Sequence, residues 1–170
     1  FSKALQARPD LVEARVQLAA YQLEAGNAAE AAQLLEGALK YDKTNVLARL
    51  NLGDAYRLLG KSTEAKKELD WVLAKEPNMA QVHYNLGLLY LFATSLPGMT
   101  PKQQADKAIT ELEKYKELAP RTKGGPDDTD ELITRAKTKK AIIEAEKSAP
   151  PPTAPAPAPA KGAAPAGGAT

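Results

Sequence analysis

The chain has 170 residues, of which 44% are hydrophobic and 26% are charged, and its formal net charge is +2. Basic and acidic residues are interleaved, which excludes the electrostatic footprint of a nucleic-acid-binding surface. No apolar run is long enough to span a bilayer. The absence of cysteine excludes disulfides, zinc ribbons and thiol catalysis from this segment.

The N-terminal residues 1–8 have the pattern of an incomplete unit, because Pro9 and Ala4 match Pro77 and Ala38 at whole multiples of a 34-residue interval. We interpret them as the end of a second helix and expect further units before Phe1. A signal peptide or lipid anchor upstream therefore remains open, and so does the compartment.

Residues 12–45 and 46–79 are two copies of a unit that reads as helix, turn and helix. Gly60 predicts a left-handed residue after the first helix of the second copy, and Pro77 predicts the end of its second helix. Gly53 lacks bulk where the two helices would cross. The pairs that match between the copies are Leu18 and Leu52, Gly26 and Gly60, Ala31 and Ala65, Leu35 and Leu69, and Leu39 and Leu73.

Residues 80–122 form a third copy whose second half arrives roughly nine residues late, with an insertion near 94–103. Thr100, Pro101 and Gln103 predict a helix start with a capping box. We expect the insertion to lengthen both helices and to make a projecting loop. Comparable side-chain caps are expected at three earlier helix starts, Asp10, Asn27 and Asn78.

Residues 128–147 predict a last helix, starting at about Thr129 and capped by Asp127 or Asp128. It would cover the exposed end of the array. Residues 148–170 are rich in alanine and proline and predict a disordered or extended tail. The apolar side of the last helix comprises Leu132, Ile133, Ala136, Ile142 and Ile143.

The pattern of residues 46–79 resembles the tetratricopeptide repeat family, and the resemblance extends over roughly residues 1–122. It implies an all-α, right-handed superhelical solenoid with a C-terminal capping helix. Arg49 departs from the family pattern, because it stands where a large aromatic is usual. The residues that carry the resemblance are Leu52, Gly53, Ala55, Tyr56, Gly60, Ala65, Leu69, Val72, Leu73 and Pro77.

The resemblance also implies a concave groove lined by the first helix of each repeat. Gln17, Asn51 and Asn85 recur at the repeat interval, so their amides could donate to and accept from an extended peptide backbone. The alternative is that these amides are merely tolerated on a wet helix face. The basic clamp of chaperone-tail receptors is absent. Further candidate partner-binding residues are Asp54, Arg57, Gln81 and Tyr84.

The apolar end of this groove, formed by Tyr84, Leu88, Leu91 and Phe92, has two interpretations. It is a pocket for a hydrophobic partner segment, or it is the surface on which the helix of residues 128–147 packs. We favour the second, because the apolar side of that helix needs a surface to cover it.

Nothing in the sequence forms a catalytic constellation, a metal site or a cofactor site. His83, the single histidine, occupies a slot where the family often has an aromatic, so we interpret it as a packing residue. Trp71 is either a convex-surface anchor or a residue packed against the next helix, and we favour packing.

The sequence thus predicts a non-catalytic scaffold or adaptor that binds an extended or helical segment of another protein, within a multiprotein assembly. An alternative is a constitutive structural subunit of a bacterial pilus, secretion or gliding machine that uses its convex face, insertion or tail. A third is an enzyme whose catalytic domain lies outside this segment. The tail favours the bacterial periplasm by analogy, with the cytoplasm second.

Overall fold

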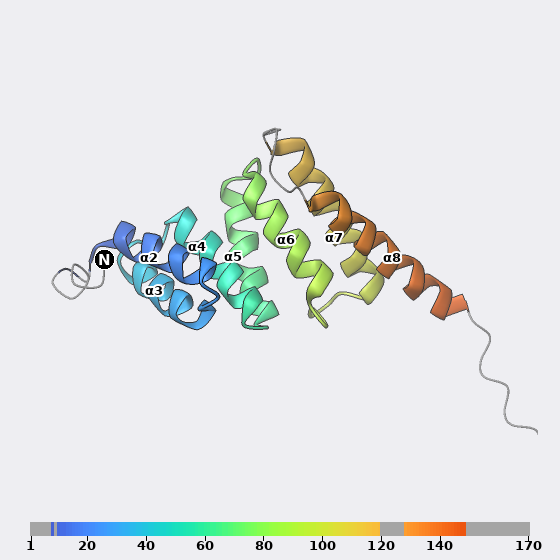
Figure 1. The fold of residues 1–170 in the computed structure, drawn as a ribbon, viewed down its shortest axis with the longest axis horizontal. Helices are drawn as coiled ribbons and strands as arrows, with labels where there is room; N and C mark the ends of the chain where they lie inside the picture. The colour runs from blue at the N-terminus through green and yellow to red at the C-terminus, as the bar shows by residue number, and fades with distance from the viewer. Residues whose placement is uncertain (1–7, 9, 120–127, 149–170) are drawn as a thin grey trace, which may run out of the picture.

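A computed structural model describes residues 8, 10–119 and 128–148, and this part of the chain contains α-helices and no strand (Figure 1). The all-α prediction is confirmed. Most of the predicted segment 1–8, residues 120–127 and all but the first residue of the predicted tail 148–170 lie outside the described residues. The helices are α2 (Val12–Glu24), α3 (Ala28–Tyr41), α4 (Val46–Leu58), α5 (Ser62–Lys75), α6 (Ala80–Phe92), α7 (Pro101–Leu118) and α8 (Thr129–Ser148).

The helices stack in chain order into an elongated array, with α2 at one end and α8 at the other (Figure 1). Each helix packs on the one before it, and α4 also contacts both α2 and α6. Two helices fall inside each predicted unit, and the first helices of the units are therefore neighbours. This arrangement is a helical-repeat solenoid, as the resemblance implied.

Close helix crossings explain the glycines of the first helices. A Cβ atom on Gly53 would lie 2.6 Å from Leu69 Cγ, and one on Gly87 would lie 2.6 Å from Leu112 Cγ. Both leucines are fully buried. Small residues at these two positions thus let α4 approach α5, and α6 approach α7, closely enough to bury a leucine between them.

The predicted helix ends in the second unit are present. Gly60 has a φ of 73°, a left-handed conformation that glycine adopts without steric cost. The N–H of Lys61 donates to the Tyr56 carbonyl at 2.8 Å, which closes the end of α4. α5 ends at Lys75, two residues before Pro77.

The inserted segment lengthens one helix and not two, so that expectation was wrong for α6. α6 has 13 residues, as α2 and α4 have, whereas α7 has 18 residues against the 14 of α3 and α5. The extended backbone of Ala93 ends α6. Leu96 of the loop is 2% exposed and belongs to the core, and the Gln104 side chain donates to the Ala93 carbonyl at 3.3 Å. The loop is therefore anchored to the hairpin.

Side-chain capping occurs where it was predicted for α7. The Gln103 N–H donates to the Thr100 hydroxyl at 3.2 Å, and the Thr100 N–H donates to the Gln103 side chain at 2.8 Å. Pro101 follows at the start of the helix. The insertion therefore ends in a helix start whose first donors are satisfied.

The side-chain caps predicted for α2, α3 and α6 are wrong. Asp10 and Asn27 bond to other side chains, and another residue stands at the cap position of α6. Asp10 forms an ion pair with Arg8 at 2.8 Å, and the Asn27 amide donates to the Gln22 side chain at 2.8 Å. Met79, and not Asn78, holds the cap position of α6. α4 instead has an unpredicted cap, in which Asn45 accepts from the Ala48 N–H at 2.9 Å.

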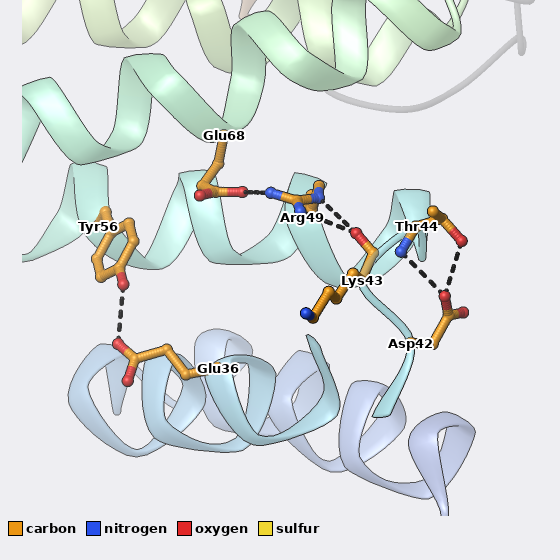
Figure 2. Close-up of polar contacts among 7 residues, drawn as sticks. All are labelled: Glu36, Asp42, Lys43, Thr44, Arg49, Tyr56 and Glu68. Atoms are coloured by element: carbon orange, nitrogen blue, oxygen red, sulfur yellow. Dashed lines mark hydrogen bonds and ion pairs between the residues drawn. The ribbon is translucent and has the colours of Figure 1, made fainter. Parts of the chain in front are cut away.

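Arg49 of α4 stands where the family usually has an aromatic residue. Its side chain links α4 to α5 and to the turn before α4 (Figure 2). Its guanidinium pairs with Glu68 of α5 at 2.5 Å and donates twice to the Lys43 carbonyl, at 2.8 and 3.0 Å. It also lies 4.4 Å from the centroid of the Trp71 ring. The aromatic group is thus supplied by α5, and the arginine ties it to the turn before α4.

Candidate polypeptide-binding groove

The three predicted amides lie on neighbouring first helices, Gln17 on α2, Asn51 on α4 and Asn85 on α6. Gln17 is exposed, and the other two are half-buried. None of the three side chains hydrogen-bonds another of the described residues, so their donors and acceptors are available to a ligand. We call the surface that they share the first-helix face.

Asp54 and Arg57, on the same helix as Asn51, form one neutralised pair and not two separate binding groups. The Arg57 guanidinium donates to Asp54 Oδ1 through Nη2 at 2.7 Å and through Nε at 2.9 Å. The Arg57 side chain is 18% exposed and the Asp54 side chain is 24% exposed. Their i,i+3 spacing places them together on α4.

The other predicted residues, Gln81, Tyr84 and Asn85, line a single cavity of about 350 Å³. Leu50 of α4 and Tyr115 of α7 complete its main walls. The Tyr84 and Tyr115 rings have centroids 5.0 Å apart with planes inclined by 52°, a favourable tilted arrangement. The cavity therefore combines side-chain amides with an aromatic wall, next to the Asn51 helix.

Tyr84 is also the contact between this cavity and the start of α8. Its hydroxyl donates to the Asp128 carboxylate, lying 3.2 Å from each oxygen. Burial, and secondly the Asp128 charge, raise the pKa of Tyr84 to about 12. Asp128 was predicted as a side-chain cap, but its carboxylate accepts from Tyr84, and its backbone carbonyl accepts from the Leu132 N–H at 2.9 Å. Asp127 lies outside the described residues.

α8 meets the apolar end of α6 through its cations. Lys139 Nζ donates to the Leu91 carbonyl at 2.7 Å, and the Arg135 guanidinium lies 4.9 Å from the centroid of the Phe92 ring. These contacts support the preferred interpretation, in which the last helix packs at this end. Packing does not cover it fully, since Phe92 is 47% exposed and Ile142 is 54% exposed.

The main surface for α8 is α7, which the sequence did not indicate. Leu132, Ile133 and Ala136 are buried in the core that α7 shares. The longer α7 also supplies carboxylates, with Lys140 pairing with Asp106 at 2.6 Å. α8 therefore takes the place of a further first helix, packed on the second helix before it.

A second cavity of about 710 Å³ lies where α6, α7 and α8 meet, and we call it the α8 cavity. Three residues line it from the α6 end and the start of α7. One face of α8 supplies the other seven. The lining comprises Leu91, Phe92, Pro101, Glu131, Thr134, Arg135, Thr138, Lys139, Ile142 and Ile143.

The α8 side of these sites was missed by the sequence analysis. Arg135 and Lys139 are spaced i,i+4, and Ile142 follows at i+7 from Arg135, so a helical projection would have placed them on one face. They were treated only as parts of a covering helix. The contacts with Leu91 and Phe92 had no local sequence signal, since those residues lie more than one repeat away.

The two aromatic candidates outside the groove have packing roles. Trp71 is half-buried against the core and lies beneath Arg49, which supports the packing interpretation. His83 is 6% exposed. Its Nε2 donates to the Pro77 carbonyl at 2.9 Å, and its Nδ1 lies 2.7 Å from a Glu111 carboxylate oxygen. Both ring nitrogens are therefore engaged within the core.

Residues 8, 10–119 and 128–148 lack the features of a metal site and of a membrane span. This part of the chain holds no group of three or more histidine, cysteine, aspartate or glutamate side chains placed to bind a metal ion. None of its helices combines the length and the apolar character that crossing a bilayer requires.

Comparison with known proteins identifies the repeat. A family model described as tetratricopeptide repeat matches residues 22–89, which run from α2 into α6 and contain both close-crossing glycines. Residues 22–89 therefore match the tetratricopeptide repeat, as the sequence pattern predicted for this stretch. The crystal structure of MamA is similar in fold, with a TM-score of 0.58 and 24% sequence identity over 85% of this chain and 86% of that one. No curated protein matches the chain.

The repeat match supports a general role in protein–protein interaction. Tetratricopeptide repeats are protein–protein interaction scaffolds, and stacked repeats present extended binding surfaces. The first helices of this chain carry amides without partners among the described residues, a half-buried ion pair and the cavity of about 350 Å³.

Proposed function

We propose that this tetratricopeptide repeat protein is a non-catalytic adaptor that binds a segment of another protein across its first-helix face. The observation that carries the proposal is the row of Gln17, Asn51 and Asn85 on contacting helices, with no hydrogen-bond partner among the described residues. Side-chain amides can donate to and accept from a peptide backbone, whatever its sequence. A row of them fits an extended or helical polypeptide.

The adjoining cavity supplies the apolar contact that such a row lacks. Gln81, Tyr84 and Tyr115 surround a space of about 350 Å³, within the range of pockets that bind small groups or anchoring side chains. Tyrosine is one of the residue types that most often contribute a large share of the binding energy at protein interfaces. The partner is thus expected to place one large side chain beside Tyr115 while its backbone contacts Asn85 and Asn51.

The proposal includes membership of a bacterial envelope assembly, in the periplasm. Its support is the composition of residues 149–170, which are mostly alanine, proline and glycine, as in extended spacers. Cell fractionation of the native protein tests this part separately from the binding test. Recovery in the cytoplasm would contradict it.

The binding test is affinity capture from native extract, comparing the wild type with a variant that carries Asn51→Ala and Asn85→Ala. We expect the double variant to bind one defined partner about 5- to 150-fold more weakly, because loss of two interface hydrogen bonds costs about 1–3 kcal/mol. The matched control is Gln33→Ala, which removes an exposed amide from α3, on a second helix. Capture that survives the double variant, and is lost on Trp71→Ala, would move the interface to the convex face.

A further inference from the structure

The charges of α8 differ between its two sides. On the side toward α7, lysines meet carboxylates, with Lys140 paired to Asp106 at 2.6 Å and Lys137 to Glu113 at 3.2 Å. On the side that lines the α8 cavity, Arg135 lies against the Phe92 ring and has no carboxylate partner among the described residues.

Lys139 shares this condition. Its ammonium group donates to the backbone carbonyl of Leu91 at 2.7 Å and pairs with no carboxylate of the described chain. Glu131 is the one acid of the cavity lining, and it lies in the first turn of α8, where the helix dipole favours a negative charge. The middle of the cavity wall is therefore cationic.

The remaining lining is apolar or already satisfied. The Thr134 hydroxyl donates to the Asp130 carbonyl at 2.8 Å, and the Thr138 hydroxyl donates to the Thr134 carbonyl at 3.0 Å. Phe92 and Ile142 are about half exposed, and they face a volume of about 710 Å³. An occupant needs apolar side chains for these two residues and carboxylates for the cations.

The shape of the lining selects the conformation of that occupant. Residues from Glu131 to Ile142 line the cavity along α8, a length of about 16 Å at 1.5 Å per residue. A helix laid along α8 would present apolar side chains at i, i+3 or i+4, and i+7 to such a surface. Aspartate or glutamate flanking that stripe would then reach Arg135 and Lys139.

We propose that the α8 cavity docks an acidic amphipathic helix of another protein. Its apolar side chains contact Phe92 and Ile142, and its carboxylates pair with Arg135 and Lys139. The inference rests on the proposed function in one respect, that the ligand is a polypeptide. It adds a second subsite at the end of the array, with its own chemistry.

The test uses the full chain and a phage-displayed library of random peptides of about 16 residues, long enough for four helical turns. Peptides that survive selection are synthesised, and their affinity is measured by fluorescence anisotropy. We expect apolar residues at helical spacing flanked by aspartate or glutamate. Selection that yields no binders, or binders without an acidic bias, overturns the proposal.

Two variants with matched controls locate the binding. Arg135→Glu and Ile142→Ser change exposed side chains, and each is expected to weaken the selected peptides about tenfold or more. The controls are Lys107→Glu on α7 and Leu59→Ser after α4, both exposed and expected to change affinity less than about twofold. A peptide with lysine in place of its acids should bind the Arg135→Glu variant better than it binds the wild type. Unchanged affinity in both variants overturns the proposal.

The remaining outcomes separate this inference from the groove proposal. Peptides that lose affinity with Asn51→Ala and Asn85→Ala, but keep it with Ile142→Ser, support the groove alone and overturn the α8 subsite. Occupancy by residues 149–170 would appear as a shift of the Ile142 methyl resonance on deleting them, before any peptide is added. A second copy would appear as sedimentation of a dimer that Ile142→Ser dissociates. Either result overturns the proposal.

Discussion

The N-terminal core cluster of the array lies beneath α2, α3 and α4, whereas the C-terminal cluster runs from α4 to α8 and includes Leu96 of the inserted loop. α4 contributes to both, with Leu52 in the first and Leu50 in the second. The first cluster is built mainly of alanine, and the second contains leucine, isoleucine and tyrosine. The C-terminal part therefore buries larger side chains and has both described cavities at its surface.

This difference indicates that the two parts of the array differ in stability. Repeat proteins derive stability from each repeat and its neighbours, so two clusters that meet at one helix can open separately. The larger cluster packs beneath Tyr84 and buries Leu132, Ile133 and Ala136, on the helix that carries Arg135. The smaller cluster is expected to be the less stable end.

The largest predicted loss of stability comes from replacing a fully buried leucine of either core cluster with alanine. Leu112→Ala and Leu35→Ala each remove a fully buried side chain, and each should lower local stability by about 2–5 kcal/mol. Hydrogen exchange followed by mass spectrometry should show lost protection in α6, α7 and α8 for the first variant, and in α2 and α3 for the second. Equal loss over all helices in both variants would show that the array unfolds as one cooperative unit, which contradicts two separately opening clusters.

A smaller effect is expected from the helix caps. Thr100→Ala removes a capping box from α7 and should cost about 1 kcal/mol of unfolding free energy, measured by urea denaturation. Asn27→Ala, at the start of α3, is the matched control and should cost less than about 0.5 kcal/mol, because Asn27 makes no side-chain cap. Equal costs would mean that capping does not distinguish the two parts of the array.

The smallest effect concerns alkaline pH. The pKa of Tyr84 is raised from its ordinary value of 10.0 to about 12, so the folded chain keeps a proton that the unfolded chain has already lost. Its contribution to stability is present below pH 10 and is lost as the pH rises through about 12. Urea denaturation between pH 9 and pH 12 should show a shallower decline for Tyr84→Phe than for the wild type.

Nearer the N-terminus, Tyr56 of α4 makes a comparable contact: its hydroxyl donates to Glu36 at 2.8 Å, and its pKa is also raised to about 12. Tyr56→Phe should therefore reduce the alkaline decline as well, but without affecting hydrogen exchange in α8. If neither phenylalanine variant differs from the wild type, the two hydroxyl contacts do not contribute to the pH dependence.

The repeat architecture was predictable because its signals are local and periodic. Gly53 is needed where two helices cross closely, and Gly60 is needed where the backbone is left-handed. The capping partner of Thr100 is Gln103, three residues later in the sequence. The side-chain caps predicted at Asp10 and Asn27 are absent because each side chain bonds to another side chain, and the capping pattern does not show which partner a side chain will choose. Arg8 and Gln22 are those partners, and only the folded geometry reveals them.

The candidate site was predictable in part for the same reason. The recurrence of Gln17, Asn51 and Asn85 follows from the repeat interval, and their role as a binding row stays a prediction. The pairing of Asp54 with Arg57 could have been inferred from their i,i+3 spacing. The contact of Lys139 with Leu91 could not, because it joins two residues 48 positions apart in the sequence, with the whole of α7 between them.

Binding across the first-helix face is tested by the footprint of the captured partner on the full chain, measured by hydrogen exchange at saturation. Added protection is expected in α4 and α6, the helices that carry Asn51 and Asn85, with no change in α3 or α5. Protection confined to α3, α5 and the Trp71 surface would contradict it and would assign binding to the opposite side of the array.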